Sequence, residues 1–239
     1  VIIPLVYFIR AKGTNLKLVK AKFDLKAILK ACSNGSSEML TNLSMSLVNM
    51  LYNAQLMKYI GSDGVVAYGI IMYISFIFSG TYLGYSIGTA PIIGYHYGAG
   101  NTEELKSLLK KSLRLILVTS IVMTGLAEIS ARLLASIFVS YDANLLDITT
   151  NAIMIFSLTF LVSGFNMFAS SFFTALNDGA VSAAISFLRT LVFQISMIYI
   201  LPLILGINGI WFAVVVAEVL SLVVSGAFLI TKRKKYQYA

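Results

Sequence analysis

The sequence predicts an all-α integral membrane protein with six transmembrane helices, and three observations support this fold class. The chain has 239 residues, of which 58% are hydrophobic and only 12% are charged. Its mean hydropathy of +0.86 exceeds that of soluble domains. Several long runs are poor in charge, and each is close to the roughly 20 residues that a helix needs to cross the hydrocarbon core. This composition excludes a soluble globular fold.

The expected elements follow in order along the chain. Residues 1–26 correspond to the end of a preceding transmembrane helix and a basic cytoplasmic linker, and residues 27–239 hold the six-helix block. Pro91–Asn101 contains a proline and closely spaced glycines, so we expect it to break the second helix. Asn101 should then cap the third helix, with Glu104 at position N3. Ser140–Asp147, rich in acidic residues, should form an outer loop. The expected spans are about 27–58, 64–90, 112–132, 148–175, 180–205 and 209–231.

The basic residues indicate the orientation of the helices. The net charge is +8, and most Lys and Arg residues fall in Arg10–Lys30, Lys106–Arg114 and Lys232–Lys235. Since cytoplasmic loops are enriched in Lys and Arg, both ends of the six-helix block are expected to be cytoplasmic. The charge lies between helices and not on a folded basic face with stacking aromatics, so no nucleic-acid partner is expected. The lipid bilayer is the expected partner.

Polar side chains recur at helical spacing within two of the expected spans. The first span carries a stripe on one face, and the fourth carries another at steps of three and four residues. The stripes predict a shared, water-filled polar cavity, although single Ser or Thr residues more often bond a neighbouring helix. The predicted cavity-lining residues are Asn42, Ser46, Asn49 and Asn53 on the first span, and Thr159, Ser163, Asn166 and Ser170 on the fourth.

Three ionisable residues lie inside expected spans, where a charge is costly and indicates a functional site by default. Glu38 shares the stripe of the first span and is the predicted ion-coupling residue, which would load and unload H⁺ or Na⁺. Arg189 and Glu218 have a structural alternative, either pairing across helices or snorkelling of the Arg stem. Gly80, Gly84 and Gly88 form overlapping GxxxG patterns that predict close helix packing. One His and one Cys give no metal site or organic cofactor, and argue against an intramembrane enzyme.

Three segments carry a family resemblance: PIIGYHYGAGN followed by a basic helix, ASIFVSYDANLLDITTNAIMIFS, and LRTLVFQISMIYILPLILGINGIW. Together they resemble the carboxyl-terminal half of the multidrug and toxic compound extrusion (MATE) transporters, over essentially the whole chain. The resemblance implies a twelve-helix, two-lobed transporter of the cell membrane, with the amino-terminal six-helix lobe missing here. It also implies secondary active export of cationic or amphipathic compounds in exchange for H⁺ or Na⁺.

The resemblance places Glu38 at the acidic position that some Na⁺-coupled members use for the cation. Those members also have an aspartate on the fourth helix of this lobe, where this chain has Ser163. A sodium site of that type is therefore not expected from this chain. Two other hypotheses remain open at this stage: a flippase for lipid-linked precursors of the related superfamily, and a truncated fragment without transport activity.

Overall fold

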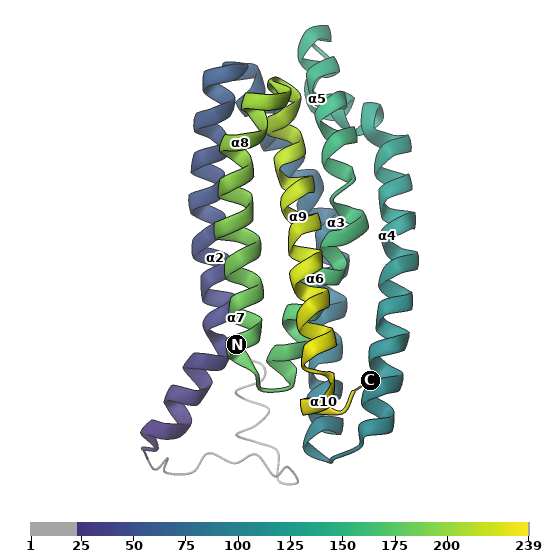
Figure 1. The fold of residues 1–239 in the computed structure, drawn as a ribbon. Helices are drawn as coiled ribbons and strands as arrows, with labels where there is room; N and C mark the ends of the chain where they lie inside the picture. The colour runs from purple at the N-terminus through teal and green to yellow at the C-terminus, as the bar shows by residue number, and fades with distance from the viewer. Residues whose placement is uncertain (1–22, 239) are drawn as a thin grey trace, which may run out of the picture. The chain divides into compact units, whose positions relative to one another are not determined.

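The computed structural model describes residues 23–238, apart from several side chains at 27–41. Residues 1–32 and 33–239 form two units, and the second is described here. The described chain is almost wholly helical (Figure 1). Its elements are α2 (Leu25–Tyr59), α3 (Ser62–Gly98), α4 (Thr102–Val139), α5 (Ala143–Ser157), α6 (Phe160–Ala175), α7 (Gly179–Phe187), the π-helix η1 (Leu188–Gln194), α8 (Ile195–Leu205), α9 (Ile207–Thr231) and α10 (Arg233–Tyr236).

Four helices of the described region, and a fifth span if a bent pair is counted as one, are long and apolar enough to cross a bilayer. α3, α4, the continuous helix of residues 179–205 and α9 are each long and apolar enough to do so, and the bent pair α5 and α6 qualifies as another span. α2 has 35 residues but falls outside this set, because Asn and Ser residues interrupt its apolar sequence. The predicted all-α membrane class is confirmed.

The turn between α3 and α4 is shorter than the sequence predicts. Pro91 lies inside α3, which continues to Gly98, so the expected break at Pro91 is wrong. Proline removes one helical hydrogen bond, but it is tolerated in membrane helices because neighbouring groups satisfy the freed carbonyl. Gly100 has φ of 68°, which glycine adopts without steric cost. The Asn101 side chain accepts a bond of 3.1 Å from the Glu104 backbone N–H, which confirms the predicted cap.

The fourth expected span is two helices and not one. α5 and α6 meet at an angle of 48°. The N–H groups of Leu158 and Thr159 bond carbonyls three residues earlier, at 3.3 and 2.9 Å, which tightens the chain and produces the bend. The expected outer loop is also shorter, because the Asp142 side chain caps α5 and residues 143–147 are helical.

The fifth and sixth spans form a tight hairpin. α7, η1 and α8 make one helix of 27 residues. Gly206, with φ of 59° and ψ of −137°, then reverses the chain into α9. A methyl group at Gly209 would overlap the backbone of Leu201 and Pro202, so α8 and α9 approach closely there.

Two clusters of buried side chains fill the bundle. The first surrounds Tyr52 and Trp211 and joins α2, α3, α4, α5, α8 and α9. The second is rich in aromatic residues, among them Phe168 and Phe172, and joins α3, α4, α6, α7 and the carboxyl-terminal residues. In contrast, a methyl group at Gly80, Gly84 or Gly88 would meet no atom within 4 Å, so the predicted packing against these glycines is not found within the described chain.

Polar contacts of Asp178 with Lys235 and Tyr236, which we call the latch, hold the carboxyl-terminal segment at the α6–α7 turn. Asp178 caps α7 through the N–H of Val181 and accepts a hydrogen bond from the phenol of Tyr236. Lys235 lies 3.5 Å from the Asp178 carboxylate. Partial burial raises the pKa of Asp178, but the bonds from Tyr236 and Val181 and the charge of Lys235 outweigh it and hold this pKa below its ordinary value. Tyr238 is buried against Phe172, with ring centroids 5.0 Å apart.

Candidate functional site

A partly open cavity of about 160 Å³, with polar and apolar side chains on its wall, lies among α2, α3, η1, α9 and the α5–α6 junction. Asn49 and Tyr52 line it from α2, and Tyr68 and Ser75 line it from α3. Its remaining polar lining comes from Ser79, Thr159, Ser163, Arg189, Gln194 and Glu218. We call this space the first cavity. Arg189 and Glu218 are the only charged residues among the described ones that line it.

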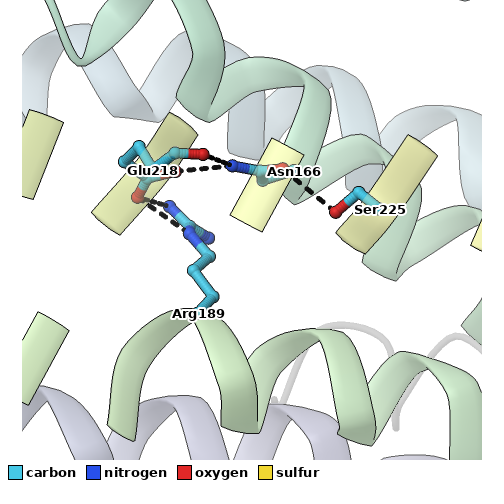
Figure 2. Close-up of polar contacts among 4 residues, drawn as sticks. All are labelled: Asn166, Arg189, Glu218 and Ser225. Carbon is cyan, nitrogen blue, oxygen red and sulfur yellow. Dashed lines mark hydrogen bonds and ion pairs between the residues drawn. The ribbon is translucent and has the colours of Figure 1, made fainter. Parts of the chain in front are cut away.

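An ion pair crosses the bundle at this cavity (Figure 2). Nε of Arg189 donates to Oε1 of Glu218 at 2.8 Å, and Nη2 lies 2.7 Å from the same oxygen. The Glu218 side chain is 3% exposed and that of Arg189 is 21% exposed. Arg189 and Glu218 thus pair with each other across helices, and pairing was one of the two structural alternatives that the sequence left open for them. A half-buried guanidinium on a fully buried carboxylate leaves part of the cation facing the cavity.

Asn166 holds the other side of the Glu218 carboxylate. Its Nδ2 donates to Oε2 of Glu218 at 2.8 Å and to the Glu218 backbone carbonyl at 2.9 Å. Ser225 in turn donates to Oδ1 of Asn166 at 3.0 Å (Figure 2). Every heavy-atom acceptor of the Glu218 side chain thus has a partner, which compensates for the desolvation of this buried carboxylate.

Two tyrosines form the aromatic wall of the first cavity. The rings of Tyr52 and Tyr68 are stacked, with centroids 4.8 Å apart and planes within 3°. The Tyr68 hydroxyl donates to Oδ1 of Asn49 at 2.6 Å, and the Tyr52 hydroxyl donates to the Ile210 carbonyl at 2.8 Å. Both rings are therefore fixed at their polar ends. Tyr52 was missed at the sequence level, although it lies three residues after Asn49 and so shares a helical face with it.

A second, smaller cavity of about 80 Å³ lies among α3, α6, α7 and η1. Its polar lining consists of Asn166, Arg189 and the serines Ser86, Ser170, Ser171 and Ser186. Arg189 lines both cavities. It lies in η1, and π-helical turns inside α-helices are frequent at functional sites.

The predicted stripes divide between these spaces. Asn49, Thr159 and Ser163 line the first cavity, whereas Asn166 and Ser170 line the second. In the fourth-span stripe, Thr159 and Ser163 lie at the start of α6, whereas Asn166 and Ser170 lie further along it.

The remaining predicted residues lie elsewhere on α2. Asn42 and Ser46 are exposed, Asn53 is half-buried, and these three line neither cavity. Glu38 lies in α2, but its side chain is outside the described residues. The described side chains contain no group of three or more His, Cys, Asp or Glu that could hold a metal ion.

The family model named MatE matches residues 38–200. The chain belongs to the MATE family of transporters. The members of this family are membrane transporters and not enzymes. No curated protein sequence matches it.

Solved MATE structures share the fold of this MATE chain. It is similar to a MATE in complex with MaL6, with a TM-score of 0.90 and 18% identity, over 100% of this chain and 54% of that chain. It is similar to a multidrug resistance MATE family transporter of the MOP superfamily in an outward-facing conformation, with a TM-score of 0.89, 20% identity, and coverage of 100% and 54%. It is also similar to a MOP superfamily transporter from Pyrococcus furiosus, which is described as having a binding pocket of reverse polarity. The TM-score is 0.88 and the sequence identity is 21%, over 99% of this chain and 54% of that chain. The chain spans about half the length of these proteins.

Proposed function

We propose that this chain supplies one six-helix lobe of a secondary active antiporter, which exports cationic or amphipathic compounds in exchange for H⁺ or Na⁺. The observation that carries the proposal is a cavity in a MATE lobe whose wall includes a buried acid and several other polar side chains. Such a cavity is costly to keep among lipid-spanning helices, and polar or ionisable groups in that environment mark substrate or ion pathways.

The lobe requires a partner in this proposal. Alternating access is largely a rocking of one repeat against another around a central site. The partner is an amino-terminal six-helix lobe, and the pair lies in the cell membrane with both ends of the described helical block on the cytoplasmic side. The basic residues 106–114 and 232–235 support this orientation.

Transport by vesicles tests the proposal directly. The 239-residue chain and a complete two-lobe transporter that contains it are reconstituted separately, and ethidium export is followed under an imposed proton or sodium gradient. We expect gradient-driven export from the complete transporter and none from the chain alone. Export by the chain alone, without dimerisation, would refute the need for a second lobe; no export by either would refute the proposed function.

Glu38 is proposed as the ion-coupling residue. Replacing Glu38 with Gln in the complete transporter removes the ionisable group and keeps its size, so export coupled to the gradient should fall at least tenfold. Glu103→Gln is the matched control, because Glu103 is an exposed acid in the first turn of α4. Equal export by the Glu38→Gln variant and the control would remove Glu38 from the mechanism.

Nothing in the described cavities favours the lipid-precursor flippase. Long anionic carriers call for a cavity of net positive charge, and Arg189 is the sole cation among the described residues that line either cavity. Glu218 neutralises it through two contacts of 2.8 Å or less. The cavity therefore offers no uncompensated positive charge to an anionic headgroup.

A further inference from the structure

The first cavity has polar groups that nothing in the described protein satisfies. The hydroxyls of Ser75 and Ser163 are buried, line the cavity, and have no hydrogen-bond partner among the described residues. Buried hydroxyls in folded proteins are almost always bonded, to protein or to an occupant. A polar occupant would supply the missing bonds, and the volume of about 160 Å³ is similar to that of cavities of about 150 Å³ that hold a benzene-sized molecule.

The chemistry of the wall fits a cation. The stacked rings of Tyr52 and Tyr68 provide an aromatic surface, which attracts organic cations through the ring quadrupole. Glu218 supplies the negative charge. The Arg189 guanidinium already neutralises that charge. It therefore occupies the position beside Glu218 where a ligand cation would be stabilised.

The second cavity offers an alternative position for the Arg189 side chain. It also lines the second cavity, where the walls carry four serines and Asn166. The Ser86 hydroxyl there is buried and has no partner among the described residues. Hydroxyl and backbone oxygens in that space can accept from a guanidinium, which has five N–H donors. A rotation of the long Arg189 side chain would therefore exchange one polar environment for another.

We propose that Arg189 is a tethered counter-cation of Glu218, and that a small organic ammonium ligand in the first cavity displaces it toward the second cavity. The ligand then lies between the Tyr52–Tyr68 wall and the freed Glu218 carboxylate. This inference rests on the proposed function for its physiological role, but the site itself is tested by binding alone. It differs from the Glu38 proposal, since it assigns cation recognition to α9 and η1.

The test is equilibrium binding of tetramethylammonium to the purified full chain in detergent micelles, at fixed pH and salt, by titration calorimetry. Arg189→Gln removes the competing cation, so tetramethylammonium should bind at least tenfold more tightly than to the wild type. The double variant Arg189→Gln/Glu218→Gln removes the attraction as well, so its affinity should return to the wild-type level or below. tert-Butanol, an uncharged probe of similar size, should not respond to either change.

Arg132→Gln is the matched charge control. Arg132 pairs with Asp147 at 3.6 Å on the surface, and both side chains are at least 70% exposed. This variant makes the same change in net charge and should bind tetramethylammonium as the wild type does.

If Arg189→Gln does not yield folded protein, Arg189→Lys replaces it. Lysine keeps the charge but cannot make the two contacts of the guanidinium with Glu218, so binding should tighten about threefold. If the ion pair has only a structural role, Arg189→Gln and Arg189→Lys should not bind tetramethylammonium more tightly than the wild type, or the double variant should gain as much affinity as Arg189→Gln does. Either result overturns the proposal. Cation export by the complete transporter, together with unchanged binding by Arg189→Gln, would refute this site and leave the proposed function standing.

Discussion

Gly164 is the position where the packing of α6 makes the most direct prediction. A methyl group there would lie 2.7 and 2.8 Å from Cδ1 and Cε1 of Tyr82, and 3.1 Å from Cγ2 of Ile116. Tyr82 is fixed, because its hydroxyl donates to the Phe160 carbonyl at 2.9 Å. Overpacking of a buried site costs about 1–3 kcal/mol, and loss of the hydroxyl bond costs about 1 kcal/mol more. The higher helix propensity of Ala offsets about 1 kcal/mol.

Gly164→Ala should therefore lower the free energy of unfolding by about 1–3 kcal/mol. For a chain of this size each kcal/mol is about 2–4 °C in Tm, so we expect a decrease of about 2–12 °C. The fluorescence of Trp211, the single tryptophan and 2% exposed, reports the transition in detergent.

Gly84→Ala is the control, because a methyl group at Gly84 meets no atom within 4 Å. Its Tm should stay the same or rise by about 2–4 °C, the effect of helix propensity alone. In a Tyr82→Leu background the cost of Gly164→Ala should largely disappear, because the ring that collides is gone. A Tm for Gly164→Ala at or above that of Gly84→Ala would show that α6 and α3 are not packed as described.

Three further predictions concern helix ends and the latch. Asp142→Ala removes the cap of α5 and should cost about 1 kcal/mol, seen as a decrease of about 2–4 °C in Tm; no decrease would contradict the cap. Because the pKa of Asp178 is lowered in the folded state, its contribution is present above the unfolded pKa of about 3.9 and is lost as the pH falls through the folded pKa. The Tm of Asp178→Asn should thus be lower than that of the wild type at pH 7, and should fall less than the wild-type Tm below pH 4. Parallel curves of Tm against pH for the two proteins would exclude this linkage. Tyr238→Ala should cost about 3 kcal/mol or more, against about 1 kcal/mol for Tyr238→Phe, which loses only the bond to the Leu229 carbonyl. Equal Tm values for these two variants would place the stabilisation in the hydroxyl.

Hydropathy was sufficient to predict the fold class, whereas the helix ends needed information that is not local. Asn101 could be predicted because its cap bond reaches only three residues, to Glu104. Pro91 misled because the same residue breaks a helix in water and is tolerated in a packed membrane helix. The bend at Leu158 and Thr159 has no Gly or Pro to signal it. It coincides with two hydrogen bonds to carbonyls three residues earlier, which no residue type at this point signals.

The candidate site was predicted in part, and for a definable reason. Helical periodicity places polar residues on a common face, and Asn49, Thr159 and Ser163 do line the first cavity. Periodicity assumes a constant rise and turn, however, and η1 departs from both over Leu188–Gln194. The meeting of Arg189 with Glu218 depends on that segment and on the turn at Gly206, so the spacing of 29 residues between them did not reveal it.

The stability of the bundle does not by itself explain why Arg189 and Glu218 face each other. Replacement of a buried ion pair by well-packed apolar residues is often neutral or stabilising, because desolvation offsets the attraction between the charges. If the pair were retained for packing alone, both of its side chains would be expected to be buried. Glu218 is buried in this way, and Asn166 and Ser225 hold its carboxylate. The Arg189 end is not closed, since its side chain is 21% exposed and lines two cavities. A rigid carboxylate opposite a partly free cation is the arrangement that permits exchange of the cation while the anion stays in place.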